Sequence, residues 1–248
     1  MGFNSGFNGK NVILLEKEKY LRPFDIIINM VEICKDPEDK VGNYQRALID
    51  RGIISYSGDF LGPKGEDLIS VALNKLRDKG QISILDAGCG TGRALFELKD
   101  QLLLRTQQEK KPNVVKAVGV NDKDFSKESH LVAVRKAIFD GYIKYIVDKL
   151  ETVRLTPNTF NLIISYETLI HNDNKTVFTI LKNLSNALAP EGRFYFNLDE
   201  KQRANPQISE FLDKAKQKKY EIFERKKKEK QLGAEEKERV FIILKKWV

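Results

Sequence analysis

Cysteine and histidine are scarce in this chain, and their scarcity excludes several kinds of site. Two cysteines, Cys34 and Cys89, and two histidines occur among 248 residues. Two isolated thiols build neither a disulfide framework nor a zinc site, so we expect a reducing, cytoplasmic environment. The run 171–174, His-Asn-Asp-Asn, carries potential metal ligands, but capping of the following helix explains its polar residues better. We therefore predict no metal site.

Long apolar runs are also missing. The longest candidates, such as 26–28, are broken by polar residues within a few positions, whereas about 18 apolar residues are needed to span a bilayer. The first six residues resemble a myristoylation signal, but Gly6 stands where serine or threonine is required, and no apolar segment of a secretory signal follows. We expect neither a membrane-spanning nor a targeting segment.

The composition is typical of a globular domain. Hydrophobic residues make up 41% of the chain, and the 31% of charged residues lie in short, scattered blocks, which argues against a wholly disordered chain. A length of 248 residues suffices for one α/β core with a small additional element. The net charge of +8 permits an anionic partner without requiring one.

Hydrophobic patterning predicts the order of the elements. From Gly80 onward, apolar runs of strand length alternate with helical patterns, which indicates repeated βαβ units and a parallel sheet. We expect strands at 82–85, 114–120, 143–147, 160–164 and 193–198, and helices at 93–104, 128–139 and 176–188. A helix and two β-rich runs then predict a closing antiparallel hairpin, at 206–219, 220–223 and 240–244.

The part of the chain before the sheet has a weaker pattern. An amphipathic helix is expected at 66–77, where it packs against the sheet. Residues 1–65, with helical segments around 24–34 and 41–50, indicate a helical arm or cap. We therefore divide the chain into this arm and a main domain at 66–248.

The most informative stretch is 84–93, Ile-Leu-Asp-Ala-Gly-Cys-Gly-Thr-Gly-Arg, where a buried strand ends in an acid and a glycine-rich turn opens a helix. Glycines at alternate positions let the backbone turn tightly and approach a ligand, and the helix presents free N–H groups. The dinucleotide fingerprint requires glycine at the position of Arg93, and the Gly-Lys-Ser/Thr of a P-loop is absent. Both phosphate-binding interpretations lose support.

This stretch resembles motif I of the class I S-adenosylmethionine-dependent methyltransferases, whose pattern is acid, x, Gly, x, Gly, x, Gly. The resemblance extends over about residues 80 to 200 and the terminal hairpin. It implies a three-layer α/β sandwich with a seven-stranded, mostly parallel, Rossmann-like sheet and a ligand at the topological switch point. It also implies that the acid and the turn line the methionine and ribose portions of the cofactor, through Asp86, Gly88, Cys89, Gly90 and Gly92.

The resemblance extends to the second strand with one departure. An acid is implied at the end of that strand, where a carboxylate holds the two ribose hydroxyls. Asn121 occupies this position, and Asp122 follows it. Either Asp122 shifts into place or the cofactor affinity is reduced.

Further cofactor residues are implied after the third and fourth strands. Asp148 and Lys149 fall where such enzymes meet the adenine amino group with an aspartate, although Asp148 would also serve as a turn cap. Ser165, Tyr166 and Glu167 fall where the family contacts cofactor and substrate. We assign the first two to the cofactor and Glu167 to the substrate.

His171 lies a few residues past the fourth strand, where a side chain that overhangs the transfer site accepts a proton. His171 and Tyr166 are the candidate catalytic residues. The alternative for His171 is a loop residue held by a backbone hydrogen bond. Cys89 has no cysteine or histidine partner nearby, so we assign it no reaction chemistry.

Aromatic residues gather before the amphipathic helix, in a region that folds over the cofactor in many such enzymes. Tyr44, Tyr56 and Phe60 lie there. Tyr56 and Phe60 are candidate substrate contacts in a lid that excludes water. The alternative is that these rings anchor a cap to the core.

A basic stretch, residues 214–230, contains nine lysines or arginines against three glutamates and so carries +6 of the net charge of +8. It either holds an RNA backbone or keeps the edge of the hairpin soluble and closed to strand addition.

Together these features predict a methyltransferase that moves the methyl group of S-adenosylmethionine to an oxygen or nitrogen nucleophile, with S-adenosylhomocysteine as the product. The Asp/Asn/Ser-Pro-Pro-aromatic motif of enzymes that methylate nucleic-acid amines is missing, and so are the paired glutamates of arginine methyltransferases. A small-molecule acceptor is therefore expected. An RNA methyltransferase and a non-catalytic, methyltransferase-like scaffold remain open.

Overall fold

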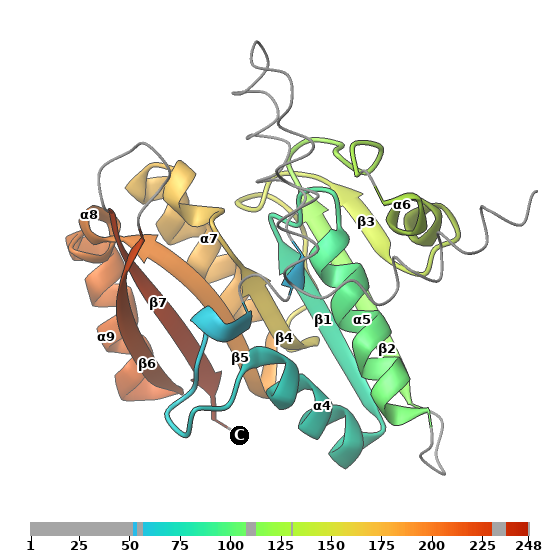
Figure 1. Ribbon diagram of the computed structural model, residues 1–248. Coiled ribbons are helices and arrows are strands. Elements are labelled where there is room, and N and C mark those ends of the chain that lie inside the picture. Colours follow the sequence, from blue (N-terminus) through green and yellow to red (C-terminus); the bar gives the residue numbers. More distant parts are fainter. Residues whose placement is uncertain (1–51, 54–56, 108–112, 130, 230–236, 248) are drawn as a thin grey trace, which may run out of the picture. The chain divides into compact units, whose positions relative to one another are not determined.

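The computed structural model of the protein describes residues 52–53, 57–107, 113–129, 131–229 and 237–247, all within one compact unit spanning 49–248 (Figure 1). The helices expected at 24–34 and 41–50, and both Tyr44 and Tyr56, lie outside the described residues.

The described elements alternate between strand and helix along most of the chain. The strands are β1 (Gln81–Ala87), β2 (Val114–Asn121), β3 (Lys144–Val147), β4 (Phe160–Ser165), β5 (Leu188–Asp199), β6 (Tyr220–Glu229) and β7 (Lys237–Lys246). The helices are α4 (Leu68–Lys79), α5 (Arg93–Thr106), α6 (Val132–Phe139), α7 (Asn174–Ala187), α8 (Glu200–Arg203) and α9 (Pro206–Lys218), with 3₁₀ turns η2 (Ser57–Asp59) and η3 (Leu169–His171).

All seven strands form one sheet in the order β3-β2-β1-β4-β5-β7-β6. The first five are parallel, and β7 inserts antiparallel between β5 and β6. The strand order reverses between β1 and β4, so the carboxyl ends of these strands form a topological switch point. The predicted α/β class, the seven-stranded sheet and the antiparallel hairpin are confirmed.

Local signals in the sequence explain where the helices begin and end. The Asp67 carboxylate accepts a hydrogen bond from the backbone N–H of Ser70 at the start of α4, and Gly80 ends that helix at a φ of 68°. Asp173 caps α7 through the N–H of Thr176, so the polar run after His171 does serve a helix cap. Asn205 caps α9 just before Pro206.

The structure differs from the predicted elements at several places. The helix expected at 128–139 begins only at Val132, because residues 122–131 form a loop after β2. β5 starts directly after α7, and Pro190 and Gly192 lie in an irregularity of the β4–β5 pairing instead of separating the two elements. The short helix α8, which follows β5, has no apolar periodicity and was not predicted.

Apolar side chains on the two faces of the sheet form two separate cores. One core, which includes Ile84 and Leu98, packs under α4 and α5. The other, which includes Ile163 and Leu181, packs under α7 and α9 (Figure 1). The amphipathic helix before β1 therefore packs as expected, and the three layers are confirmed. Among the described residues, no helix combines the length and the apolar content needed to cross a membrane.

Candidate functional site

The glycine turn after β1 has positive φ angles, which residues with a side chain rarely adopt. Gly88, Gly90 and Gly92 have φ values of 88°, 53° and 85°. The N–H groups of Gly88 and Cys89 both donate to the carbonyl of Val120 in β2, at 2.8 and 3.2 Å. These bonds tie the turn to the neighbouring strand at the carboxyl edge of the sheet.

Glycine is required at position 88 also because the Thr168 side chain, which follows β4, lies too close for a Cβ atom. A Cβ atom built on Gly88 would lie 2.0 Å from the hydroxyl oxygen of Thr168. The segment after β4 therefore reaches directly over the glycine turn. The two loops that flank the switch point are in contact, and they form one site.

Asp86 is buried under this turn. Its exposed fraction is 4%, and its carboxylate accepts no hydrogen bond from the part of the chain that the structure describes. Burial raises the pKa of Asp86 to about 7, because the ionised form has lost its hydration without gaining a partner. A cationic group of a ligand would restore the charge balance.

Cys89 packs into the protein. Its sulfur occupies the space next to Gly119 in β2, where a Cβ atom would lie 2.7 Å away. Burial, followed by the charge of Asp86, raises the pKa of the Cys89 thiol well above its usual range. The thiol stays protonated near neutral pH and fills space.

Asn121 ends β2 and organises the loop that follows. Its side-chain oxygen accepts a hydrogen bond from the N–H of Gly90 at 3.4 Å. Its side-chain nitrogen donates to the carbonyl of Lys123 at 2.9 Å and to the Asp122 carboxylate at 3.4 Å. The Asn121 amide is thus committed to the protein, whereas Asp122 is exposed beside the turn.

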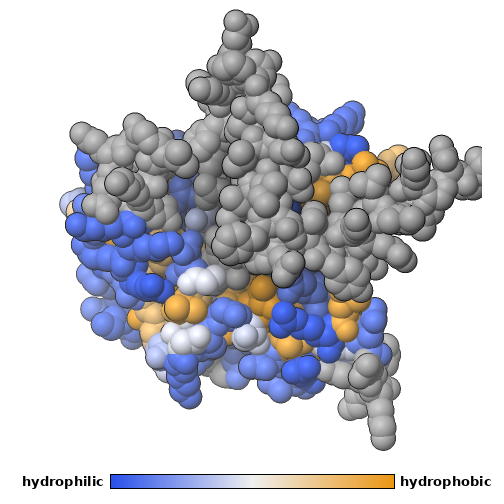
Figure 2. Space-filling model, viewed as in Figure 1, coloured by the Kyte–Doolittle hydropathy of each residue, from blue (hydrophilic) through white to orange (hydrophobic). Residues whose placement is uncertain are grey.

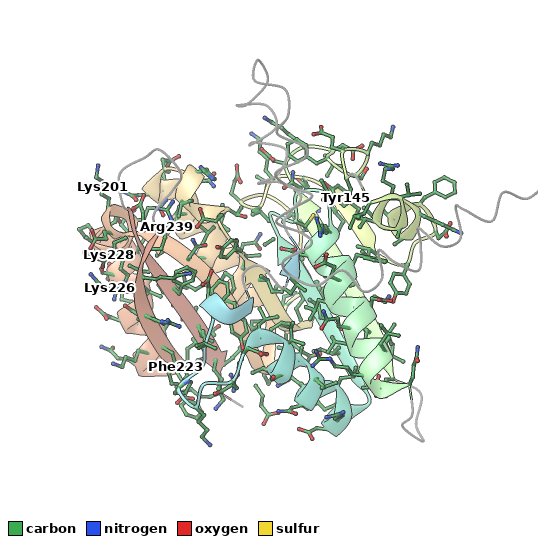
Figure 3. The ribbon with its side chains drawn as sticks, in the orientation of Figure 1. Tyr145, Lys201, Phe223, Lys226, Lys228 and Arg239 are labelled. Atoms are coloured by element: carbon green, nitrogen blue, oxygen red, sulfur yellow. The ribbon has the colours of Figure 1, made fainter. Side chains whose placement is uncertain are left out.

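Tyr145 in β3 is a residue of this site that the sequence reading missed. Its hydroxyl donates to the carbonyl of Gly90 at 2.6 Å and accepts from the N–H of Phe125 at 3.3 Å. Tyr145 therefore joins the glycine turn to the loop after β2, on the β3 side of the sheet (Figure 3). No sequence motif around Tyr145 indicates a role in the site, because it lies within an ordinary strand pattern.

Asp148 follows β3 in an exposed turn. Its Oδ1 atom accepts from the N–H of Lys149 at 2.7 Å and from the Thr152 hydroxyl at 3.4 Å. Its own N–H donates to the carbonyl of Asn121 at 2.9 Å, which places the turn beside the end of β2. Asp148 thus caps a turn next to the site, and Lys149 is exposed there.

Ser165 and Tyr166 leave the end of β4 in different environments. The Ser165 hydroxyl is buried and has no hydrogen-bond partner within the part of the chain that the structure describes. The Tyr166 hydroxyl donates to Asp59 at 3.2 Å, and its ring stacks on Phe241 at 6.4 Å between centroids. Phe60 is 1% exposed and meets both rings edge-on, a position that favours core anchoring over substrate contact.

Glu167 is held in a polar network with β5 and β7. It has a φ of 54°, and its N–H donates to the side-chain oxygen of Asn197 at 2.7 Å. The Asn197 side-chain nitrogen donates to Glu167 Oε1, and Arg239 Nε lies 3.3 Å from the same atom. Local patterns do not predict this network, because its members are up to 72 residues apart.

His171 is exposed at the end of η3. Its loop is held from below by Gln202 in α8, whose side-chain nitrogen donates to the carbonyls of Leu169 and Asn172 at 2.8 and 3.0 Å. Gln202 is buried and was not predicted as a site residue. No group of three potential metal ligands occurs among the described residues.

The described part of the basic stretch lies on α9 and β6. Several of its lysines face nearby acids: Lys226 bonds Glu200 and Glu238, and Lys227 bonds Asp59. This side of the molecule is largely hydrophilic (Figure 2). The positive charge of the stretch is therefore partly balanced by carboxylates outside it.

Comparisons with known proteins agree with this geometry. A family described as a methyltransferase domain matches residues 78–239. A solved structure from Listeria monocytogenes, assigned to the class I S-adenosylmethionine-dependent methyltransferases, is 18% identical to this chain. The match covers 88% of this chain and 77% of that chain, with a TM-score of 0.52. A TehB-like methyltransferase from Corynebacterium glutamicum is 19% identical, with 78% and 97% covered and a TM-score of 0.46.

The N-methyltransferase NodS from Bradyrhizobium japonicum, solved with S-adenosylhomocysteine, is 14% identical, with 72% and 88% covered and a TM-score of 0.45. No sequence among the curated proteins is significantly similar to the chain. Since the family match covers more than half of the residues and includes β1 to β6, the chain belongs to the methyltransferase domain family.

Proposed function

We propose that this protein transfers the methyl group of S-adenosylmethionine to an oxygen or nitrogen nucleophile of a small molecule. The observation that carries the proposal is Asp86, a buried carboxylate without a partner among the described residues, at the end of the strand that leads into the glycine turn. A buried ionised group requires a compensating charge. The amino-acid end of the cofactor supplies an ammonium group.

The residues present fit this cofactor in most respects. Gly88, Gly90 and Gly92 present backbone without side chains, and the buried Ser165 hydroxyl at the end of β4 has no hydrogen-bond partner among the described residues. Asp122 and Asp148 are exposed carboxylates beside the turn, suited to ribose hydroxyls and the adenine amino group. Asn121 fits less well, since its amide already bonds Gly90 and Lys123.

When bound, the cofactor supplies an already activated methyl group on a positive sulfur. The protein then has mainly to hold the acceptor in line, so proximity and orientation provide most of the acceleration. His171, on the loop that Gln202 supports, is the candidate proton acceptor for a weakly acidic hydroxyl. With an acceptor in hand, His171→Ala should lower turnover and leave cofactor binding intact; unchanged turnover removes His171 from the mechanism.

Thermal unfolding with and without S-adenosylhomocysteine tests the proposal. A ligand that binds only the folded state stabilises it by about 2.7 kcal/mol at one hundred times its dissociation constant. That corresponds to a rise of roughly 5–10 °C in Tm for a domain of this size. Asp86→Asn should fold and show a much smaller rise, because the amide cannot pair with the ligand ammonium.

Asp140→Asn, which alters an exposed aspartate at the end of α6, is the matched control and should behave as the wild type. No rise in Tm for the wild-type protein at millimolar ligand would contradict cofactor binding. A rise without methyl transfer to any acceptor would favour the alternative of a binding scaffold.

A further inference from the structure

Arg239 in β7 is a buried cation with unusually few partners. Its side chain is 6% exposed, and its one ion pair within the described ranges joins Nε to Glu167 Oε1 at 3.3 Å. Among the described residues, neither terminal nitrogen of its guanidinium has a hydrogen-bond partner. A guanidinium carries five donors, and since neither terminal nitrogen is among the buried side-chain atoms that lack a partner, these donors reach the surface of the described residues.

Arg203 in α8 is an arginine of the same molecule in which all three guanidinium nitrogens have a hydrogen-bond partner. Its Nε and Nη2 atoms bond both oxygens of Glu224 at 3.0 and 2.9 Å, and Nη1 bonds Ser209 at 3.0 Å. Yet the Arg203 side chain is the more exposed of the two, at 26%. The more deeply buried arginine therefore has the fewer partners.

The surroundings of Arg239 keep its guanidinium in place. Glu167, which binds Nε, is itself held by two hydrogen bonds to Asn197 and has a φ of 54°. A non-glycine residue in this region persists only when its neighbours enforce it, and such residues concentrate at functional sites. The network thus fixes Nε and leaves the outer fork of the guanidinium available.

Arg239 lies at the edge of the sheet where the cofactor site lies. It pairs with Asp199, the last residue of β5, and Figure 3 shows it on the hairpin side of the sheet. Its partner Glu167 immediately precedes Thr168, the residue that contacts Gly88 in the glycine turn. The two unpaired nitrogens are therefore close to the loops that bind cofactor and acceptor.

Resting on the proposed function, we propose that the outer fork of Arg239 binds a carboxylate of a ligand at this edge. Two parallel N–H donors match the two oxygens of a carboxylate, which makes arginine selective for such planar anions. The carboxylate belongs either to an acidic acceptor or to the amino-acid end of the cofactor. Arg239 is accordingly a specificity-determining residue and takes no part in the reacting bonds.

Calorimetric titration with two nucleosides distinguishes these sources. S-adenosylhomocysteine carries a carboxylate, whereas 5′-methylthioadenosine lacks the amino-acid end altogether. If Arg239 binds the cofactor, Arg239→Gln should weaken the affinity for S-adenosylhomocysteine at least about tenfold and leave the affinity for 5′-methylthioadenosine unchanged. If it binds the acceptor, both affinities should remain as in the wild type.

The acceptor arm uses benzoate as the probe and benzamide as its uncharged match, both titrated in the presence of saturating 5′-methylthioadenosine. Benzoate presents a planar carboxylate to the guanidinium, and benzamide has nearly the same shape without the charge. If the acceptor is the source, benzoate should bind the wild type more tightly than benzamide does, and Arg239→Gln should abolish the difference.

Two further variants separate recognition from folding. Arg239→Lys keeps the charge beside Glu167 but lacks the two parallel donors, so it should fold. If Arg239→Gln does not fold, Arg239→Lys takes its place and should show the same selective loss of affinity. Arg203→Gln removes a comparable ion pair on α8 and should leave every affinity unchanged.

The proposal is overturned if Arg239→Gln lowers the affinities for both nucleosides equally, since a merely structural role would give that result. The same holds for Arg239→Lys where it replaces Arg239→Gln. It is also overturned if neither nucleoside nor the benzoate preference changes. A wild-type protein that binds neither nucleoside refutes the proposed function instead, and this inference then fails with it.

Discussion

At the scale of single residues, the chemistry of the site centres on a carboxylate held away from water. Asp86 has a pKa of about 7, which is far above the value of 3.8 for an unburied aspartate. The folded state therefore binds a proton that the unfolded state has lost between about pH 4 and pH 7. Asp86 destabilises the ligand-free protein increasingly across this window, and the penalty is complete above pH 7.

This pKa predicts how cofactor affinity depends on pH. A ligand ammonium pairs with the ionised form of Asp86, which is the minor form at pH 6 and the major form at pH 8. The affinity for S-adenosylhomocysteine should therefore be about tenfold higher at pH 8 than at pH 6. Titration calorimetry at several pH values measures this, and Asp86→Asn should remove the dependence. An affinity that is flat with pH in the wild type would refute the pairing.

At the scale of elements, the ends of strands β1, β2 and β4 act together through their loops. Asn121 links the glycine turn to the loop after β2 by accepting from Gly90 and donating to Lys123. Thr168 closes the same turn from the β4 side by filling the space beside Gly88. The loops of the candidate site therefore form a connected unit, because hydrogen bonds and close packing join them.

Asn121→Asp tests the departure from the family pattern. The new carboxylate would face the carbonyl of Lys123 in place of a donor, which should lower the free energy of unfolding without ligand by about 1–3 kcal/mol. It would also offer two acceptor oxygens to the ribose hydroxyls, so the rise in Tm with S-adenosylhomocysteine should exceed that of the wild type. Denaturant unfolding and thermal shifts measure the two effects.

Asp122→Asn is the companion variant, because Asp122 is exposed and its loss should cost little stability. Reduced ligand affinity in this variant, together with no gain in Asn121→Asp, would mean that Asp122 holds the ribose.

At the scale of the whole molecule, the excess of positive charge is local and partly neutralised. The stretch 214–230 carries most of the net charge of +8, yet Lys226 and Lys227 bond acids on α8, β7 and η2. Lysines along the edge strand β6 also protect it from pairing with another chain. Partial neutralisation weakens the case for RNA, so the small-molecule acceptor remains our proposal.

The charge distribution leads to a prediction for RNA. Fluorescence anisotropy with a single-stranded RNA of about 20 nucleotides should show at most weak binding at low salt, and none at 150 mM salt. Submicromolar binding at 150 mM salt, with a steep loss as salt rises, would instead support the RNA alternative. Lys226→Ala and Lys227→Ala would then be expected to reduce that salt dependence.

The sequence by itself determined the features that local rules encode. Alternating runs predicted the strands and most helices, because side-chain periodicity follows directly from strand and helix geometry. The spacing of Gly88, Gly90 and Gly92 after Asp86 predicted the glycine turn, which we propose as the cofactor site, because positive φ angles demand glycine at those three positions.

Only the tertiary structure decided which distant residues meet. The insertion of β7 between β5 and β6 brings Arg239 to Glu167, 72 residues away in sequence, and neither carries a local signal of that contact. Tyr145 and Gln202 likewise support the site from β3 and α8. Strand order is settled by packing of the complete sheet, so partners across strands follow from the fold and not from spacing along the chain.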